Sequence, residues 1–166
     1  EILGALQALW TQDTPEFSGA FYRYSGLKFS PKPLQKPYPP LLIGGSSAAA
    51  HARVARFGDG WHTLRQSPRQ FAAGREKISA LAEAAGRNPS SLHYSLALPL
   101  KFTTKAPSAP LQDRTALTGT EDDIADTIRA YDAAGVDELV VGVSSADVGE
   151  NTDALSRLMQ QVWPKL

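Results

Sequence analysis

The sequence contains no cysteine among its 166 residues. This absence excludes a disulfide framework and any metal site built from thiolates. The sequence also has no excess of charge, because 17 Lys and Arg residues balance 17 Asp and Glu residues. A protein without such an excess lacks the electrostatic features that attract nucleic acid or an anionic membrane surface. We therefore expect no partner of either kind.

Long hydrophobic runs are absent as well. No stretch approaches the roughly 18 consecutive apolar residues of a membrane-spanning helix, and we recognise no signal peptide. With 42% hydrophobic residues the chain can still bury a core, so we expect a cytoplasmic globular protein. The chain begins at Glu1, within a stretch of helical periodicity, and we expect the natural protein to start further upstream.

The stretch 39–63 has the pattern of a complete βαβ unit: PPLLIGGSSAAAHARVARFGDGWHT. Its apolar run 41–43 shows no polar alternation, which predicts a strand buried on both faces of a parallel sheet. A helix over the following alanines and a second strand up to Thr63 complete the unit.

Two glycines and two serines join the first strand of this unit to its helix. Gly44 and Gly45 end the strand, and either Ser46 or Ser47 can cap the helix. The N–H groups of Gly45, Ser46 and Ser47 would then lie at the positive end of the helix, where a phosphate can approach a main chain without side chains. The alternative is a tight turn with a good cap and no ligand.

The rest of the chain alternates between helix and strand. We expect helices over 1–10, 68–85, 120–134 and 155–162, strands over 60–63, 93–100 and 138–143, and irregular segments over 25–40 and 101–117. This order predicts an α/β fold with parallel strands. Because a complete TIM (β/α)8 barrel takes about 250 residues, we expect a partial TIM (β/α)8 barrel with four parallel strands. We expect residues 1–166 to form a single domain, the back half of such a barrel.

The three histidines are the first candidates for acid and base chemistry. His51 lies in the short helix and is expected to face solvent. His62 lies in a strand that should end at the barrel mouth, where it can touch a cofactor or substrate, whereas His93 starts its strand at the opposite end. No histidine pair has a metal-binding spacing and no serine lies in a GxSxG elbow, so we expect neither a metal site nor an acyl-transfer hydrolase.

Four segments together carry a resemblance: ALWTQDTPEFSGAFYRY, FSPKPLQKPYPPLLIGGSS, ARVARFGDGWH and LTGTEDDIADTIRAYDAAGVDELVV. In this order they resemble the carboxyl-terminal half of luciferase-like monooxygenases, and most of all the deazaflavin-dependent branch. The resemblance implies a TIM barrel and an oxidoreductase with FMN or a deazaflavin, coenzyme F-420, as cofactor. It implies that Gly44, Gly45, Ser46 and Ser47 contact the phosphate of that cofactor.

The same resemblance implies an insertion over the barrel mouth at residues 17–40, where Phe29, Lys32 and Gln35 are candidates to meet a small-molecule substrate. Asp59 and Trp61 match a family motif, and we interpret both as structural. In the family most residues near the reacting centre come from the first four strands, so the catalytic residues stay unknown.

A second hypothesis is a non-catalytic half-barrel that binds phosphate or pairs with another chain. Four parallel strands would leave two unpaired edges and an apolar interior, so we expect a homo-oligomer.

Overall fold

The computed structural model describes residues 1–166, and the contacts between residues divide them into two compact units, Glu1–Leu41 and Leu42–Leu166. The first unit begins with α1 (Ile2–Thr11), followed by a hairpin of β1 (Phe17–Ser18) and β2 (Arg23–Tyr24). Residues 25–41 contain no helix or strand. The predicted helix over 1–10 and the irregular segment over 25–40 are confirmed.

Two charged side chains hold the first unit together. The Glu1 carboxylate accepts hydrogen bonds from the N–H groups of Ala20, Phe21 and Tyr22, at 2.6–2.9 Å. The Lys32 ammonium donates to the carbonyls of Leu9 (2.7 Å) and Gln12 (2.6 Å), which lie at the carboxyl end of α1. A cation at this end satisfies carbonyls that have no partner in the helix.

The second unit contains a sheet in which every paired strand is parallel. Its strands are β3 (Leu42–Gly44), β4 (Gly60–Leu64), β5 (His93–Phe102), β6 (Leu117–Gly119) and β7 (Glu138–Gly142). The long strand β5 pairs with β4, β6 and β7, and β3 pairs with β4. The four strands predicted from the sequence are confirmed, in the order β3, β4, β5, β7.

Strand β6 contradicts the prediction of an irregular segment over 101–117. Strand β5 continues to Phe102, and its last three residues pair with β6. The reason is that β4 and β7 pair with β5 only as far as Ala97 and Pro99, so its carboxyl end still offers unpaired main-chain groups. A strand as short as β6 has no periodicity from which it could have been predicted.

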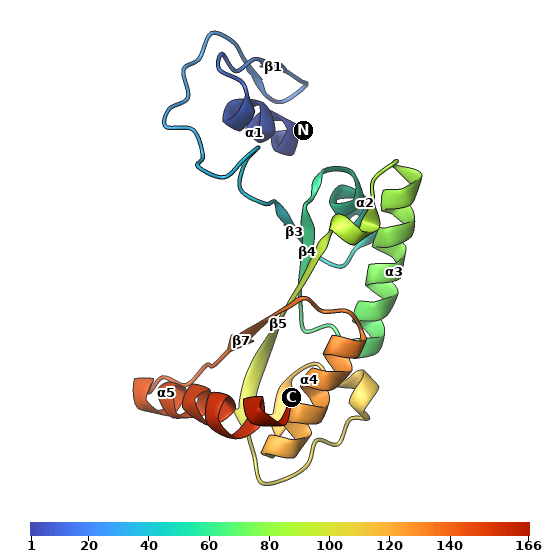
Figure 1. The fold of residues 1–166 in the computed structure, drawn as a ribbon, viewed down its shortest axis with the longest axis vertical. Helices are drawn as coiled ribbons and strands as arrows, with labels where there is room; N and C mark the ends of the chain where they lie inside the picture. Colours follow the sequence, from blue (N-terminus) through green and yellow to red (C-terminus); the bar gives the residue numbers. More distant parts are fainter. The chain divides into compact units, whose positions relative to one another are not determined.

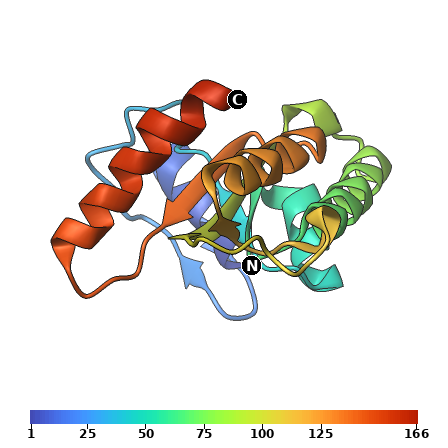
Figure 2. The same ribbon diagram turned by 90° about the horizontal axis from the view of Figure 1, so that it is seen from below.

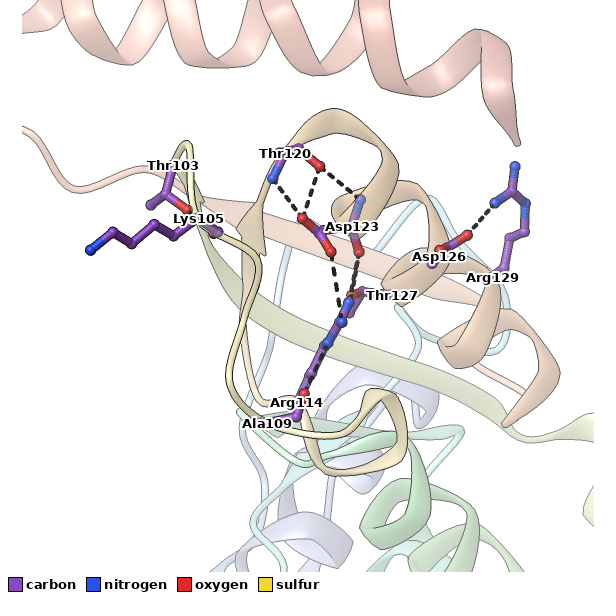
Figure 3. Close-up of polar contacts among 9 residues, drawn as sticks. All are labelled: Thr103, Lys105, Ala109, Arg114, Thr120, Asp123, Asp126, Thr127 and Arg129. Atoms are coloured by element: carbon purple, nitrogen blue, oxygen red, sulfur yellow. Dashed lines mark hydrogen bonds and ion pairs between the residues drawn. The ribbon is translucent and has the colours of Figure 1, made fainter.

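Arg114 anchors the segment that leads into β6 (Figure 3). Its guanidinium, with only 14% of the side chain exposed, donates to the carbonyl of Asp123 (3.0 Å) and to Thr127 Oγ1 (2.8 Å). Both acceptors belong to α4 (Glu121–Ala133). Thr120 and Asp123 form the predicted capping box at the start of this helix, and the hydrogen bonds from Thr120 lower the pKa of the Asp123 carboxyl.

Helices cover one face of the sheet. Figures 1 and 2 show α2 (Ala48–Phe57), α3 (Pro68–Ala84) and α4 on one side of the strands. They bury a core with the even-numbered residues of β5, and its largest members are Trp61, Tyr131, Phe71, Ile78, Leu96, Leu98, Leu117 and Ile124. The last helix, α5 (Val148–Arg157), continues as a π-helical turn (Leu158–Val162) that adds Leu158 and Val162 to this core.

The other face of the sheet is bare within this unit, and this corrects one prediction. Residues 41–43 were expected to be buried on both faces, but Leu42 is 41% exposed, and Val140 of β7 is likewise 42% exposed. Because helices pack on one face only, β3 and β7 show the alternation of a half-buried strand. None of the helices is long and apolar enough to cross a membrane.

Candidate cofactor and substrate site

The glycine–serine turn (residues 44–47) follows β3 at the carboxyl edge of the sheet. All four residues are exposed, and Ser47 is the N-cap of α2, where its Oγ accepts a hydrogen bond from the N–H of Ala50 at 3.2 Å. No hydrogen bond within the chain uses the main-chain N–H groups of Gly45, Ser46 or Ser47. The turn therefore presents three free donors beside the positive end of a ten-residue helix, an arrangement that suits an anion.

Glycine at position 45 has a conformational reason. Its φ of +102° is one that residues with a side chain rarely adopt, and an added Cβ would lie 3.3 Å from the Cβ of Ala50. At Gly44 an added Cβ would meet only the carbonyl oxygen of His62, at 3.9 Å. The main chain of the turn is therefore accessible to a bulky anion on this side, and the turn can accommodate a phosphate.

Trp61 supports the turn from the core. Its indole Nε1–H donates to the carbonyl of Gly45 at 2.6 Å, while the ring is fully buried and stacks on Phe71 at 5.1 Å between centroids. The ring also fills the space where a Cβ on Gly74 would lie, 2.5 Å away. Trp61 is therefore structural, as expected, and it fixes the position of the turn through one hydrogen bond.

His51 does not face solvent, which corrects the prediction. It is 7% exposed, lies edge-on to the Trp61 ring at 5.2 Å, and its Nε2 is buried without a hydrogen-bond partner. Burial lowers the pKa of His51, and the nearby charge of Lys77 lowers it further. The burial of His51 could not be predicted, because the alanines around it give the helix no clear apolar stripe.

His62 lies on the bare face of the sheet, in β4. In the strand register it is paired with Gly44 on one side and with Ser95 on the other. Its Nδ1 is 3.0 Å from the hydroxyl oxygen of Ser95. The structure therefore brings His62 next to the glycine–serine turn, as a candidate to touch a ligand bound there.

His93 lies at the start of β5, away from the carboxyl ends of the strands. Its Nε2 is 3.0 Å from the carboxylate of Glu138, and this hydrogen bond is the main reason why the pKa of Glu138 is lowered. The N–H of His93 donates to the carbonyl of Asp59 at 3.0 Å. These contacts join β4, β5 and β7 at the end opposite the glycine–serine turn.

Two of the three candidates in the first unit make contacts within that unit. Lys32 is engaged by the carbonyls of α1, and its ammonium also lies 5.4 Å from the ring centroid of Phe29. Gln35 is exposed. No group of three or more His, Asp or Glu side chains gathers in a way that could hold a metal ion.

A cavity of about 770 Å³, which the sequence did not indicate, lies at the carboxyl ends of β5 and β7. Arg65, Lys101, Phe102, Ser144 and Arg157 are among its lining residues. Arg65 has a φ of 50°, the one positive value among the residues that are not glycine. Backbone conformations of this kind cannot be read from sequence, although they gather at functional sites.

Comparison with known proteins identifies the class to which this fold and turn belong. The family model of luciferase-like monooxygenases matches residues 1–110, so the chain belongs to the luciferase-like monooxygenase family. The parallel strands with alternating helices are accordingly part of a TIM-barrel architecture.

Among individual relatives, the chain is 41% identical over 86 residues to an FMNH(2)-dependent dimethylsulfone monooxygenase from Pseudomonas putida. The match covers 52% of this chain and 24% of that protein, so the chain spans about a quarter of the curated relative. A second such enzyme, from Pseudomonas fluorescens (strain Pf0-1), is 37% identical over 84 residues, which are 51% of this chain and 22% of the relative.

Solved structures share the fold at low sequence identity. Monooxygenase RslO1 from Streptomyces bottropensis has a TM-score of 0.79 and 18% identity, with 98% of this chain and 59% of that chain covered. An F420-dependent secondary alcohol dehydrogenase has a TM-score of 0.77 and 16% identity, with 96% of this chain and 59% of that chain covered.

Proposed function

We propose that the glycine–serine turn binds the phosphate of a flavin or deazaflavin cofactor, and that the full-length protein is an oxidoreductase acting on a small organic molecule. The observation that carries this proposal is the set of three unbonded N–H groups at the start of α2, on a turn that Trp61 fixes from the core. Family membership supports the oxidoreductase class.

FMN is the first cofactor to test, because both curated relatives are named as FMNH(2)-dependent. F420 is the second, since an F420-dependent dehydrogenase shares the fold. When bound, such a cofactor would supply the reactivity toward oxygen or the hydride, while this chain supplies position and electrostatics. The cavity beside Arg65 and Lys101 would accommodate the organic substrate, at the edge of the sheet where TIM-barrel enzymes place their active sites.

We extend the proposal to the architecture of the full-length protein. Residues 1–166 would form part of one barrel domain, with the segment 17–40 over its mouth. Strands β3 and β7 each pair with a single neighbour in this chain, so further strands of the protein or of a second copy would pair with their outer edges. A non-catalytic role is not favoured, because the relatives are named as enzymes.

A ligand pair that differs by the phosphate alone tests the proposal. We expect FMN to bind about a hundredfold more tightly than riboflavin in isothermal titration calorimetry, because charge-assisted hydrogen bonds to a phosphate contribute roughly 3 kcal/mol in total. For F420 the counterpart is the deazaflavin that ends in the hydroxyl-bearing chain, which lacks the phosphate together with the groups beyond it. If neither phosphate-bearing cofactor binds more tightly than its counterpart, the turn is not a phosphate site.

A further inference from the structure

Two cations without partners line the cavity at the carboxyl ends of β5 and β7. Arg65 directly follows β4, Lys101 lies near the end of β5, and both residues are exposed. Neither the Arg65 guanidinium nor the Lys101 ammonium forms a hydrogen bond or an ion pair within the chain. The part of the lining that the sheet forms therefore carries two positive charges that no neighbouring group neutralises.

The other charged residues of the lining belong to α5. Arg157 is already paired, because its Nε donates to the carboxylate of Glu121 at 2.7 Å. Glu150 accepts a hydrogen bond from Ser145 Oγ at 2.5 Å, and Asp153 forms no ion pair. Neither of these two carboxylates comes within ion-pair distance of the cations at the sheet, so a negative group placed at the sheet would meet the cations first.

The main chain at Arg65 is fixed in an uncommon conformation. A φ of +50° is rare for a residue with a side chain, and such conformations persist only where the surroundings hold them. The N–H of Arg65 donates to the carbonyl of Ala97 at 3.1 Å, and the carbonyl of Gln66 accepts from the hydroxyl of Tyr131 at 2.8 Å. Ser67 then caps α3. The fold thus holds the backbone of Arg65 rigidly at the edge of the cavity.

The rest of the lining suits the carbon skeleton of an organic molecule. Pro99, Phe102, Val143 and Ala154 contribute apolar surface, and about 770 Å³ lies within the range of pockets for small molecules. A guanidinium offers two parallel N–H donors that match a carboxylate, and an ammonium adds a second positive charge. The cavity therefore combines a cationic part with an apolar part.

We propose that this cavity binds the substrate as an organic anion. Arg65 and Lys101 hold an oxyanion such as a carboxylate, and the apolar lining contacts the carbon skeleton. The two cations are specificity-determining residues, which select the charge of the substrate and position it. This inference rests on the proposed function, because it assigns to this cavity the organic substrate of the oxidoreductase.

Acids and amides of the same shape test the proposal in the full-length protein. We expect benzoate to bind about tenfold more tightly than benzamide, and hexanoate than hexanamide, in NMR titrations at neutral pH and constant ionic strength, because charge-assisted hydrogen bonds contribute at least this factor. Arg65→Gln and Lys101→Gln should each reduce this preference several-fold and leave the affinity for the amides unchanged. Arg65→Lys keeps the charge and should retain part of the preference.

Two further variants serve as controls. Arg69→Gln removes an arginine charge from an exposed position that does not line the cavity, so the preference for the acids should stay as it is in the unaltered protein. Asp153→Asn removes a negative charge from the lining, so the acids should bind as tightly as before or more tightly. Weaker binding of both acids in Asp153→Asn, or an equal loss in Arg69→Gln and Arg65→Gln, overturns the proposal.

The two proposals fail in distinguishable ways. If neither acid binds more tightly than its amide while FMN still binds more tightly than riboflavin, the inference about the substrate is wrong and the phosphate site stays in place. If Arg65→Gln and Lys101→Gln weaken FMN at least as much as they weaken the acids, the cations serve the cofactor and the inference is overturned. If the acids are preferred but neither FMN nor F420 binds, the cavity is an anion site and the proposed function is wrong.

Discussion

Placing a carboxylate on the glycine–serine turn is the most direct test of the phosphate site. Gly45→Asp adds a carboxylate to the turn whose N–H groups, those of Gly45, Ser46 and Ser47, would contact the phosphate. At a separation of about 5 Å and an effective dielectric constant of about 40, each pair of unit charges repels by about 1.7 kcal/mol. A phosphate with about 1.5 to 2 negative charges then loses about 3 kcal/mol, or about a hundredfold in affinity.

Gly45→Asn is the matched control for this substitution. Asn has nearly the same shape as Asp and meets the same backbone strain at φ +102° and the same contact with Ala50, but it carries no charge. The ratio of the FMN dissociation constants of the two variants, measured by calorimetry at low and high salt, therefore isolates the electrostatic effect. Equal dissociation constants for the Asp and Asn variants would refute the phosphate site, whatever the absolute affinity.

Three further substitutions test the parts of the fold around this turn. Trp61→Phe removes the donor to the carbonyl of Gly45; we expect an unfolding free energy lower by about 1–2 kcal/mol in urea titrations and a weaker affinity for FMN. Because burial lowers the pKa of His51 below 6.5, the unfolded chain binds more protons, so stability should fall as pH drops below that value; His51→Leu should reduce this slope between pH 7.5 and 5.5. Arg114→Ala leaves the carbonyl of Asp123 and the hydroxyl of Thr127 without their donor and should cost about 2–3 kcal/mol, whereas an unchanged urea midpoint would contradict the anchoring role.

The main elements of the second unit could be predicted because their signals are local. Ser47 next to a run of alanines marks a helix start, Thr120 with Asp123 marks another, and Gly86 at φ +71° and Gly135 at φ +85° mark two ends. Apolar runs between these helices are typical of parallel strands, and the alternation leads to the TIM-barrel class. The glycine–serine turn was predictable for the same reason, since a strand, two glycines and a cap are consecutive in the chain.

The features that could not be predicted depend on which faces of each helix or strand are covered by other parts of the protein. The apolar run at 41–43 indicates a strand. The sequence does not show that helices cover only one face of this strand, so the exposure of Leu42 was not predicted. His51 was placed in solvent because its burial depends on Trp61, ten residues later, turning its ring under α2. The three-residue strand β6 forms only because β5 extends beyond its other partners.

Register explains why the row formed by His62, Ser95 and Glu138, which are paired across three neighbouring strands, could not be predicted from the sequence. These residues are separated by 33 and 43 positions, and nothing near any of them suggests a polar partner. Pairing fixed at Leu96 with Leu139 and at Thr63 with Leu96, on the covered face, also sets which residues meet on the bare face. A shift of one residue in either pairing would turn His62 or Glu138 toward the core and break the row. The packing of apolar side chains against the helices therefore decides, across the thickness of the sheet, which polar residues meet on its bare face.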